Sequence, residues 1–289
     1  MVTIAGATGH VGSAVATKLL QSGAKIRVIV HSKEKGERFA EGGAEVAIGR
    51  LEDAQFLEYA LRGCEGAFLL LPRPVPPPPT AGDMRSGARK MAAGFANAVR
   101  ASKTPHVVFV SAQGAQHAQG VGIIGTLHDV EVELAKTGAV LTILRCAEMM
   151  ENFEPLLSTM RDRGVLPNFN LEDRARAFIA SRDVGEEAAK ALLAGPKASR
   201  IIELAGPADY APMQVAAAFS KALGKPIKLA TVISGIADAL KAAGTPASVA
   251  ELAAETREAV NAGRVVFEHP GAVIRTGTTL EQFAAEIVA

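Results

Sequence analysis

The chain has 289 residues, of which 48% are hydrophobic and 21% charged, and its formal net charge is +1 at pH 7. This composition excludes an intrinsically disordered chain, and the balanced charge argues against a broad surface for nucleic acid or an acidic membrane. Only Cys64 and Cys146 are present, so we expect no disulfide framework and a reducing, cytoplasmic compartment. The amino terminus carries neither a basic segment nor a long apolar run, which predicts no signal peptide and no membrane anchor.

Short β-rich segments alternate with helical patterns through the first half of the chain, which predicts βαβ units around a parallel sheet. Strands are predicted at residues 2–5, 26–30, 45–48, 66–71, 106–111, 140–144 and 200–204. Helices are predicted at residues 11–22, 56–61, 86–102, 128–137, 152–163, 184–194, 212–223 and 279–288, with two further Ala-rich helices before the last one. Residues 164–178 read as a loop with short extended pieces, and Thr278 to Glu281 resembles a helix capping box. The proline-rich run at 72–80 is incompatible with a helix or a central strand, so we expect an extended loop there.

The strongest chemical signal is a Gly-x-x-Gly-x-x-Gly pattern between the first predicted strand and the first predicted helix. Gly6 allows a sharp turn, Gly9 allows the backbone to approach a pyrophosphate, and Gly12 permits close packing of helix on strand. The alternative is a tight turn without a ligand, but the strand–turn–helix context favours a dinucleotide. The predicted contacts from this loop are Gly6, Ala7, Thr8, Gly9, His10, Val11 and Gly12.

The end of the second predicted strand bears on the choice of dinucleotide. Sites that prefer NAD place a carboxylate there to accept from the ribose 2′-hydroxyl. Here the strand ends in His31, Ser32 and Lys33, a set suited to a 2′-phosphate, so NADP(H) is favoured over NAD(H). The alternative is that the charges from Lys33 onward are only the solvated start of a helix.

These motifs together resemble the NmrA-like branch of the atypical short-chain dehydrogenase/reductases, nearly from end to end. The residues that carry the resemblance are Gly6–Gly12, Leu57–Leu71, Val107–Ser111, Thr142–Arg145 with Met150–Asn152, Glu203–Pro207 and Arg275–Leu280. The resemblance implies a Rossmann-type doubly wound parallel sheet with a smaller C-terminal α/β substrate domain. It also implies an NAD(P)H-dependent reductase of quinones, azo dyes or related compounds, or a regulator that binds NADP without turnover.

The same resemblance suggests domain limits. We predict an NAD(P)-binding domain at residues 1–151, to which residues 180–204 return, and a substrate-binding domain at residues 152–179 and 205–289. The sequence departs from the family pattern at His31, where Arg is frequent, at Arg50, where an acidic residue is frequent, and at Cys146-Ala147, where Pro-Gly is usual near the nicotinamide.

The acid of ordinary short-chain dehydrogenases, the Tyr of a Tyr-x-x-x-Lys pair, has no counterpart here. Tyr59 is followed four residues later by Gly63, and Tyr210 by Gln214. The sequence therefore gives no support to the usual carbonyl–alcohol mechanism.

Ser111 and His128 are the predicted catalytic residues. Ser111 ends the fifth predicted strand, on the side where open α/β sheets bind ligands, although a serine there is as often a cap. The family frequently has Lys or His followed by Glu at the position of His128 and Glu131, and a spacing of three places both on one helix face. Glu131 would then orient His128 near the nicotinamide; the alternative is a surface pair. Arg145 and the Glu151-Asn152 pair read as structural.

Further predicted cofactor contacts lie after other strands. Leu71 ends the fourth predicted strand and Pro72 follows it, Ser111 ends the fifth, and Cys146 follows the sixth. Cys146 is either a reactive thiol beside the nicotinamide or a buried apolar residue. The stiff loop with Arg73 would wall the site or contact a partner. His117 and His269 have no ligand-spaced partners, so we expect no metal.

The leading hypothesis is an NADP(H)-dependent oxidoreductase that transfers hydride to an electron-poor small molecule such as a quinone. Such acceptors delocalise the developing charge and need little acid catalysis, which suits a site without the usual Tyr. The alternative is a non-catalytic NADP-binding redox sensor that acts through a protein partner. For the enzyme we expect a small-molecule substrate, no nucleic acid, no membrane, and a monomer or homodimer.

Overall fold

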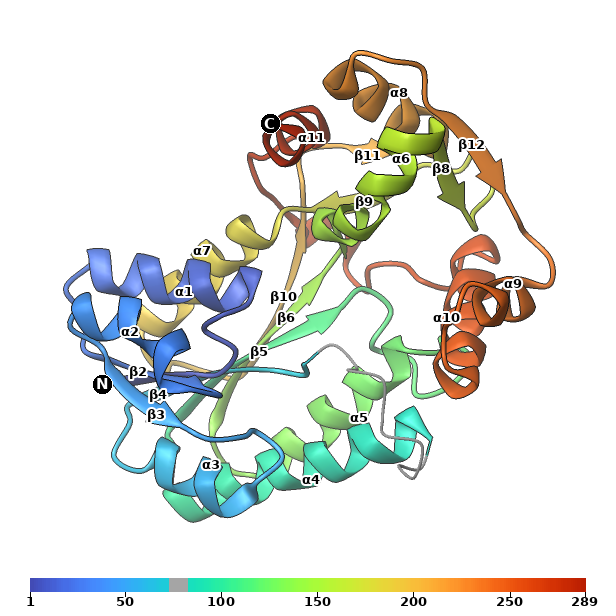
Figure 1. Ribbon diagram of the computed structural model, residues 1–289. Helices are drawn as coiled ribbons and strands as arrows, with labels where there is room; N and C mark the ends of the chain where they lie inside the picture. Colours follow the sequence, from blue (N-terminus) through green and yellow to red (C-terminus); the bar gives the residue numbers. More distant parts are fainter. Residues whose placement is uncertain (73–82) are drawn as a thin grey trace. The chain divides into compact units, whose positions relative to one another are not determined.

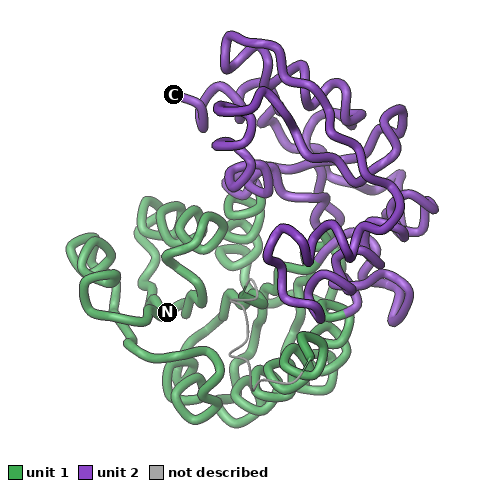
Figure 2. Tube along the Cα trace, turned by 45° about the vertical axis from the view of Figure 1, so that its right-hand side comes forward, with its two compact units in different colours: residues 1–111, 126–145, 184–202 green, residues 112–125, 146–183, 203–289 purple. Residues whose placement is uncertain are grey.

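The computed structural model describes residues 1–72 and 83–289. The predicted loop contact of Arg73 and the rest of the proline run therefore lie outside the described residues. Two compact units are distinguished by their internal contacts (Figure 2). Unit 1 contains residues 1–111, 126–145 and 184–202, and unit 2 contains residues 112–125, 146–183 and 203–289. Residues 112–125, which the sequence-based limits place in the first domain, group with unit 2.

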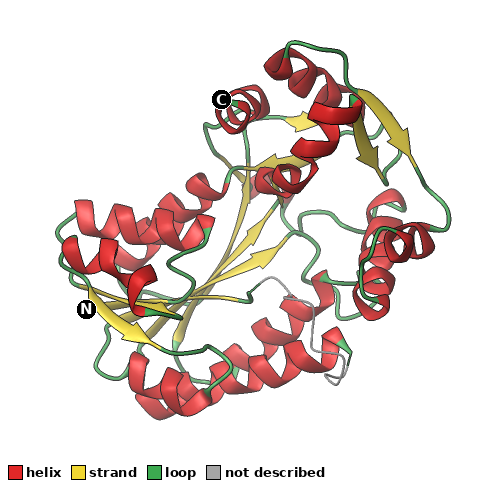
Figure 3. Cartoon of the chain, viewed as in Figure 1, coloured by secondary structure: helices red, strands yellow, loops and turns green. Residues whose placement is uncertain are grey.

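An eight-stranded sheet has the strand order β13-β10-β6-β5-β4-β1-β2-β3 (Figures 1 and 3). The pairs β1–β2, β2–β3, β1–β4, β4–β5 and β10–β13 are all parallel. Its strands are β1 (Val2–Ile4), β2 (Ile26–Val30), β3 (Glu45–Ile48), β4 (Gly66–Leu70), β5 (His106–Ala112), β6 (Val140–Cys146), β10 (Arg200–Ala205) and β13 (Ile274–Arg275). This order and direction confirm the predicted Rossmann-like α/β fold.

Helices cover both faces of the sheet in unit 1, with α1, α2 and α7 on one face and α3, α4 and α5 on the other (Figure 1). They are α1 (His10–Gln21), α2 (Lys33–Glu41), α3 (Ala54–Leu61), α4 (Met84–Ser102), α5 (Ile124–Ala135) and α7 (Ser181–Leu193). Val11, Val15 and Leu19 repeat at helical spacing and form the buried stripe of α1. Because both faces are covered, β4 is apolar along its whole length rather than alternating.

Unit 2 combines two small sheets with helices. β9 pairs antiparallel with β11 and parallel with β7, and β12 pairs in parallel with β8. Its elements are β7 (Glu148–Met149), η1 (Met150–Leu156), α6 (Leu157–Arg163), β8 (Val165–Asn168), β9 (Arg176–Ile179), β11 (Asp209–Tyr210), α8 (Pro212–Leu223), β12 (Lys228–Thr231), α9 (Ile236–Ala242), α10 (Ala247–Asn261), η2 (Pro270–Ala272) and α11 (Leu280–Val288). Its core centres on Phe153, whose ring centroid lies 5.4 Å from those of both Phe178 and Phe219.

Several predicted boundaries shift in the structure. α5 begins at Ile124 rather than at 128, α7 begins at Ser181 rather than at 184, and the region 152–163 divides into η1 and α6. The capping box of α11 is formed by Thr279 and Gln282, one residue later than the pattern that begins at Thr278. Among the described residues, no helix combines the length and the apolar character needed to cross a membrane.

Candidate functional site

In the glycine turn between β1 and α1, the first and third glycines cannot be replaced by a larger residue without strain. Gly6 has φ +64°, in the left-handed region that favours glycine, and its carbonyl accepts from the Gly9 amide at 2.9 Å. A Cβ on Gly12 would lie 2.2 Å from the Gly6 carbonyl oxygen, so α1 touches the turn main chain directly. The predicted roles of these two positions, a sharp turn and close packing, agree with this geometry.

Gly9 is different, because nothing in the chain requires it to lack a side chain. Its φ of −89° is open to any residue, and a Cβ there would meet only the Gly6 carbonyl oxygen at 3.5 Å, an ordinary contact. Gly9 is also the N-cap of α1, without a side-chain capping bond and without an acidic residue in the first turn. An exposed helix N-terminus approached over an exposed glycine is the arrangement that receives a phosphate anion.

The carboxyl end of β2 offers cations, but its serine is already engaged. His31 and Lys33 are exposed, and Ser32 is the extended N-cap of α2. The Ser32 hydroxyl forms a hydrogen bond to Glu34, the main cause that lowers the pKa of that exposed carboxyl. The Glu34 carboxylate therefore lies next to Ser32, and its negative charge weakens the attraction of this edge for a 2′-phosphate.

Arg38 is a cation at this edge that sequence reasoning missed. Its Nη2 lies 3.3 Å from Ser13 Oγ, to which it donates, so the side chain of α2 reaches the first turn of α1. The guanidinium also stacks over Phe39, 4.5 Å from the ring centroid. Its spacing, five residues after Lys33, gave no local signal; the helix–helix contact brings it to α1.

Ser111 lies in a buried polar triad rather than standing alone at the strand end. Its hydroxyl donates to Glu131 Oε1 at 2.5 Å, and it is only 2% exposed. Arg145 forms a bidentate pair with the same carboxylate, with Nε 3.1 Å from Oε1 and Nη2 2.7 Å from Oε2. β5, α5 and β6 are thereby tied together. The sequence paired Glu131 with His128 and did not anticipate that Arg145 and Ser111 hold this carboxylate.

His128 lies on α5, four residues after the helix begins, and is half-buried. The next residue, Asp129, accepts from Arg85 at 3.3 Å and from Arg89 at 3.0 Å, which links α5 to α4. The two carboxylates of α5 nearest to His128 in the sequence, Asp129 and Glu131, are therefore both paired with arginines. The proposed role of His128 in proton transfer rests on its position and side-chain type alone.

Cys146 ends β6 and is 2% exposed. Burial raises the pKa of its thiol far above the ordinary value, so the thiolate is strongly disfavoured. Of the two readings, this supports the small apolar residue over the reactive thiol. Leu71 and Pro72 follow β4 and are half-buried, and the preceding Leu70 packs against the turn, with its Cδ2 2.9 Å from where a Gly6 Cβ would be.

Other residues singled out in the sequence hold the fold. Both oxygens of Glu151 accept from the Ser181 amide, at 2.9 and 3.1 Å, at the start of α7. The Tyr210 hydroxyl accepts from the Leu280 amide at 3.2 Å and donates to Glu281 at 3.3 Å, so this tyrosine supports α11. Tyr59 is 66% exposed. Within residues 1–72 and 83–289, no three His, Cys, Asp or Glu side chains group as metal ligands.

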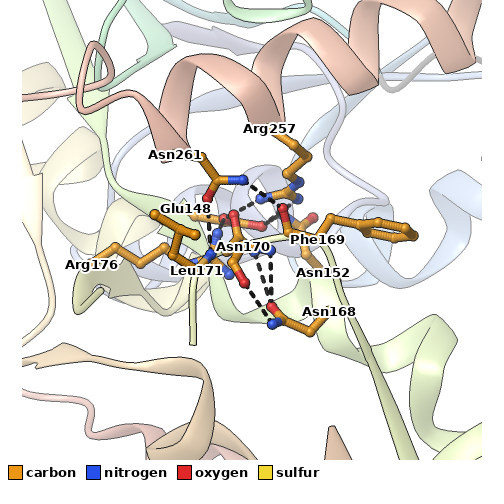
Figure 4. A network of polar contacts seen from close by, with 9 residues as sticks. All are labelled: Glu148, Asn152, Asn168, Phe169, Asn170, Leu171, Arg176, Arg257 and Asn261. Atoms are coloured by element: carbon orange, nitrogen blue, oxygen red, sulfur yellow. Dashed lines mark hydrogen bonds and ion pairs between the residues drawn. The ribbon is translucent and has the colours of Figure 1, made fainter. Parts of the chain in front are cut away.

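Unit 2 contains a charged cluster that the sequence analysis did not identify, formed by Glu148, Arg176 and Arg257 (Figure 4). Arg257 Nη1 and Nη2 each donate to one Glu148 oxygen at 2.9 Å, and Arg176 Nη1 lies 2.9 Å from Oε2. Burial works to raise the pKa of Glu148, but the two guanidiniums outweigh it and hold that pKa far below its usual range. One signal was available: Arg176 shares a strand face with the fully buried Phe178, an unusual place for a charge.

The parallel sheet and the glycine turn place the chain among Rossmann-like α/β proteins. The sequence model of the NmrA-like family matches residues 1–265, and the chain belongs to that family. Among curated relatives, it is 24% identical over 252 residues to NAD(P)H azoreductase of Xenophilus azovorans, covering 87% of this chain and 84% of that protein. It is 28% identical over 265 residues to (4-alkanoyl-5-oxo-2,5-dihydrofuran-3-yl)methyl phosphate reductase of Streptomyces griseus, covering 91% and 88%.

Solved structures show the same fold along the whole chain. NADPH-dependent quinone oxidoreductase QOR2 of Escherichia coli, complexed with NADPH, superposes with a TM-score of 0.82 at 24% identity, covering 100% of both chains. NmrA, a negative transcriptional regulator in complex with NADP, superposes with a TM-score of 0.74 at 20% identity, covering 99% of this chain and 95% of NmrA.

Proposed function

We propose that this protein is an NADP(H)-dependent oxidoreductase that reduces an electron-poor small molecule, with a quinone as the best candidate. The observation that carries the proposal is the glycine turn, where Gly12 holds α1 against the main chain while Gly9 leaves the helix N-terminus open. Family membership and the names of the relatives, an azoreductase and a phosphate-ester reductase, support oxidoreductase chemistry on varied acceptors.

The chain's own residues do the binding. The Thr8–His10 segment and the first amides of α1 hold the pyrophosphate, since their dipole favours an anion. His31, Lys33 and Arg38 stabilise the 2′-phosphate, which favours NADP(H) over NAD(H). Leu71, Pro72 and Cys146 give apolar contacts; the neutral thiol of Cys146 takes no part in chemistry.

When bound, NADPH supplies the hydride. Reduction of a quinone to a hydroquinone consumes one hydride and one proton, and His128 is the proposed source of that proton. Ser111 acts with Glu131 and Arg145 to fix the carboxyl ends of β5 and β6, because its hydroxyl proton is directed at Glu131. No Tyr-x-x-x-Lys acid is required, since the acceptor delocalises the charge. Tyr210 is occupied in supporting α11.

The direct test is to mix the purified protein with NADPH and a panel of quinones and to follow the absorbance of the reduced nicotinamide. We expect oxidation of NADPH that depends on the acceptor, and a turnover loss of about tenfold or more in His128→Ala. His117→Ala, an exposed histidine of the same type, is the matched control and should retain turnover.

The second candidate is a redox sensor that binds NADP without turnover, which the structural likeness to the regulator NmrA favours. Saturable binding of NADPH without oxidation by any acceptor would favour that candidate. Failure of both nicotinamide coenzymes to bind would refute both candidates.

A further inference from the structure

The cluster of Glu148, Arg176 and Arg257 in unit 2 has a net charge of +1. Two guanidiniums share one carboxylate, and the three side chains are only 20%, 16% and 27% exposed. Arg257 takes both oxygens of Glu148 in a bidentate pair and is thereby satisfied by it. The excess charge therefore resides on Arg176.

Arg176 has hydrogen-bond donors that the chain leaves unused. Its Nε and Nη1 atoms are buried and have no hydrogen-bond partner, although Nη1 lies 2.9 Å from Glu148 Oε2 as an ion pair. The flat face of the guanidinium rests over Phe178, 4.7 Å from the ring centroid, which fixes the plane of the group. On the edge away from Nη1, a guanidinium presents parallel N–H donors that match two oxygens of an oxyanion.

The neighbouring loop is held in place by hydrogen bonds from its own and neighbouring side chains. Asn168 donates to the Asn170 carbonyl at 2.7 Å, and Asn261 accepts from the Leu171 amide and donates to the Phe169 carbonyl, both at 3.0 Å. Within this fixed loop the Asn170 Oδ1 is also buried without a hydrogen-bond partner, but as an acceptor it does not pair with an oxyanion. Figure 4 shows this loop and the arginines within one network. A buried donor without a partner is costly, so an oxyanion that accepts from Arg176 Nε gains binding energy.

Glu148 lies close in the chain to the carboxyl end of β6. Glu148 follows the last residue of β6, Cys146, by only two positions, and ligands of open α/β sheets bind outside the carboxyl ends of the strands. α10 presents Arg257 and Asn261 four residues apart on one face, so a single helix supports both the charged pair and the loop.

We propose that Arg176 is a specificity-determining residue that binds an oxyanion of the acceptor, so that the preferred substrates are quinone-like compounds bearing a sulfonate, carboxylate or phosphate group. This deepens the proposed function and rests on it for the identity of the acceptor. Binding of the oxyanion itself is independent of turnover, which lets the two be tested separately.

The binding experiment compares naphthalene-2-sulfonate with the uncharged naphthalene-2-sulfonamide. Neither compound has a quinone carbonyl to accept a hydride, so binding is measured without turnover. Calorimetry on the full chain should show tighter binding of the sulfonate. Arg176→Gln should weaken it roughly 10- to 100-fold, the loss of a charged hydrogen-bonding partner. Arg176→Lys, which keeps the charge but not the planar edge, should weaken it by at least about fivefold.

Arg275→Gln is the matched control, because it also removes one positive charge from unit 2 but breaks an exposed pair with Asp209. It should change sulfonate binding less than about twofold. Equal binding of sulfonate and sulfonamide to the wild-type protein, or a sulfonate affinity unchanged in Arg176→Gln, would overturn the proposal and leave the cluster as a structural ion pair. If Arg176→Gln does not fold, the wild-type comparison and Arg176→Lys still decide.

The kinetic experiment compares 1,4-naphthoquinone-2-sulfonate with the uncharged 2-methyl-1,4-naphthoquinone. Arg176→Gln should raise KM for the sulfonate roughly 10- to 100-fold while changing kcat/KM for the neutral quinone less than about threefold. Equal losses for both quinones would refute the specificity role while the reductase function stands. Sulfonate binding without reduction of either quinone would refute the reductase function while the oxyanion site stands.

Discussion

The glycine turn of unit 1 and the Arg176 cluster of unit 2 are both suited to anions, but they are built in opposite ways. The turn uses main-chain amides and a missing side chain, and all of its parts lie within seven consecutive residues, Gly6 to Gly12. The cluster uses side-chain charges from β7, β9 and α10, which are separated by up to 109 residues. A main-chain site leaves a local sequence pattern, whereas a side-chain site assembled by tertiary contacts leaves almost none.

Substitution of the glycine turn should separate its closely packed position, Gly12, from its open position, Gly9. Gly12→Ala places a Cβ 2.2 Å from the Gly6 carbonyl, so we expect loss of NADPH affinity of at least about 100-fold together with lower stability. Gly9→Ala has room for its Cβ in the protein, so it should retain the wild-type melting temperature while NADPH affinity falls, because the methyl group occupies the ligand's approach.

Gly94→Ala serves as the control, since Gly94 lies in α4 with open space around it. It should stabilise the protein by about 0.5–1 kcal/mol and leave NADPH binding unchanged. Thermal melts and calorimetry on the three variants provide the measurements. If Gly9→Ala binds NADPH as tightly as the wild type, the turn does not receive the pyrophosphate in the way proposed.

Glu148→Gln addresses the side-chain site. It leaves two guanidiniums facing each other without a carboxylate, and we expect destabilisation of roughly 3 kcal/mol in urea unfolding at pH 7. The folded-state pKa of Glu148 is lowered below its unfolded value near 4.5, so this stabilisation is complete above about pH 4.5 and is lost as the pH falls. The difference between wild type and variant should therefore shrink in acid.

The matched substitution for that experiment is Asp209→Asn, which breaks the exposed pair with Arg275. It should cost at most about 1 kcal/mol. Equal destabilisation by Glu148→Gln and Asp209→Asn at pH 7 would show that the cluster stores no more energy than a surface pair.

The sequence was sufficient for seven of the eight strands of the large sheet, for the turn and for the family, because their signals are local or periodic, but the two-residue strand β13 was missed. β4 reads as a continuous apolar run, and the turn follows β1 directly. The partner of Glu131 could not be read in the same way. His128 lies three residues away on the same helix, yet the carboxylate pairs with Arg145, 14 residues further on, since β6 delivers that guanidinium to α5. The short strands β8 and β12 were likewise missed as a pair, because 63 residues separate Asn168 from its partner Thr231.

Arg38→Gln tests whether side chains at the edge of the glycine turn contribute to NADPH binding. Arg38 reaches Ser13 on α1, so its loss should weaken NADPH binding about fivefold and leave NADH binding within about twofold. Arg62→Gln, an exposed arginine paired with Glu58 on α3, should affect neither coenzyme. Equal losses for NADPH and NADH would mean that Arg38 does not contact the 2′-phosphate.

A substitution of His106 tests whether a buried polar atom without a hydrogen-bond partner always marks a ligand site, and its expected effect is small. His106 in unit 1 resembles Arg176 in this respect, since its Nδ1 is buried without a partner while Nε2 contacts Thr142 Oγ1 at 3.1 Å. However, His106 begins β5, at the amino end of the strand, where open α/β sheets do not bind ligands. Burial, with a smaller contribution from Arg200, lowers the pKa of His106, so the neutral ring stabilises the fold above about pH 6.5 and this stabilisation is lost as the pH falls.

We therefore expect His106→Gln to flatten the decline in unfolding free energy between pH 7.5 and pH 5.5 by about 1 kcal/mol, with NADPH and sulfonate binding unchanged. His117→Gln, at an exposed position, should keep the wild-type pH dependence. The opposite result, a loss of ligand affinity in His106→Gln with an unaltered pH profile, would assign the unpaired nitrogen to binding. The proposed ligand site at Arg176 would then rest on the charge of Arg176 and on the position of its partner Glu148 after β6, rather than on unpaired donors.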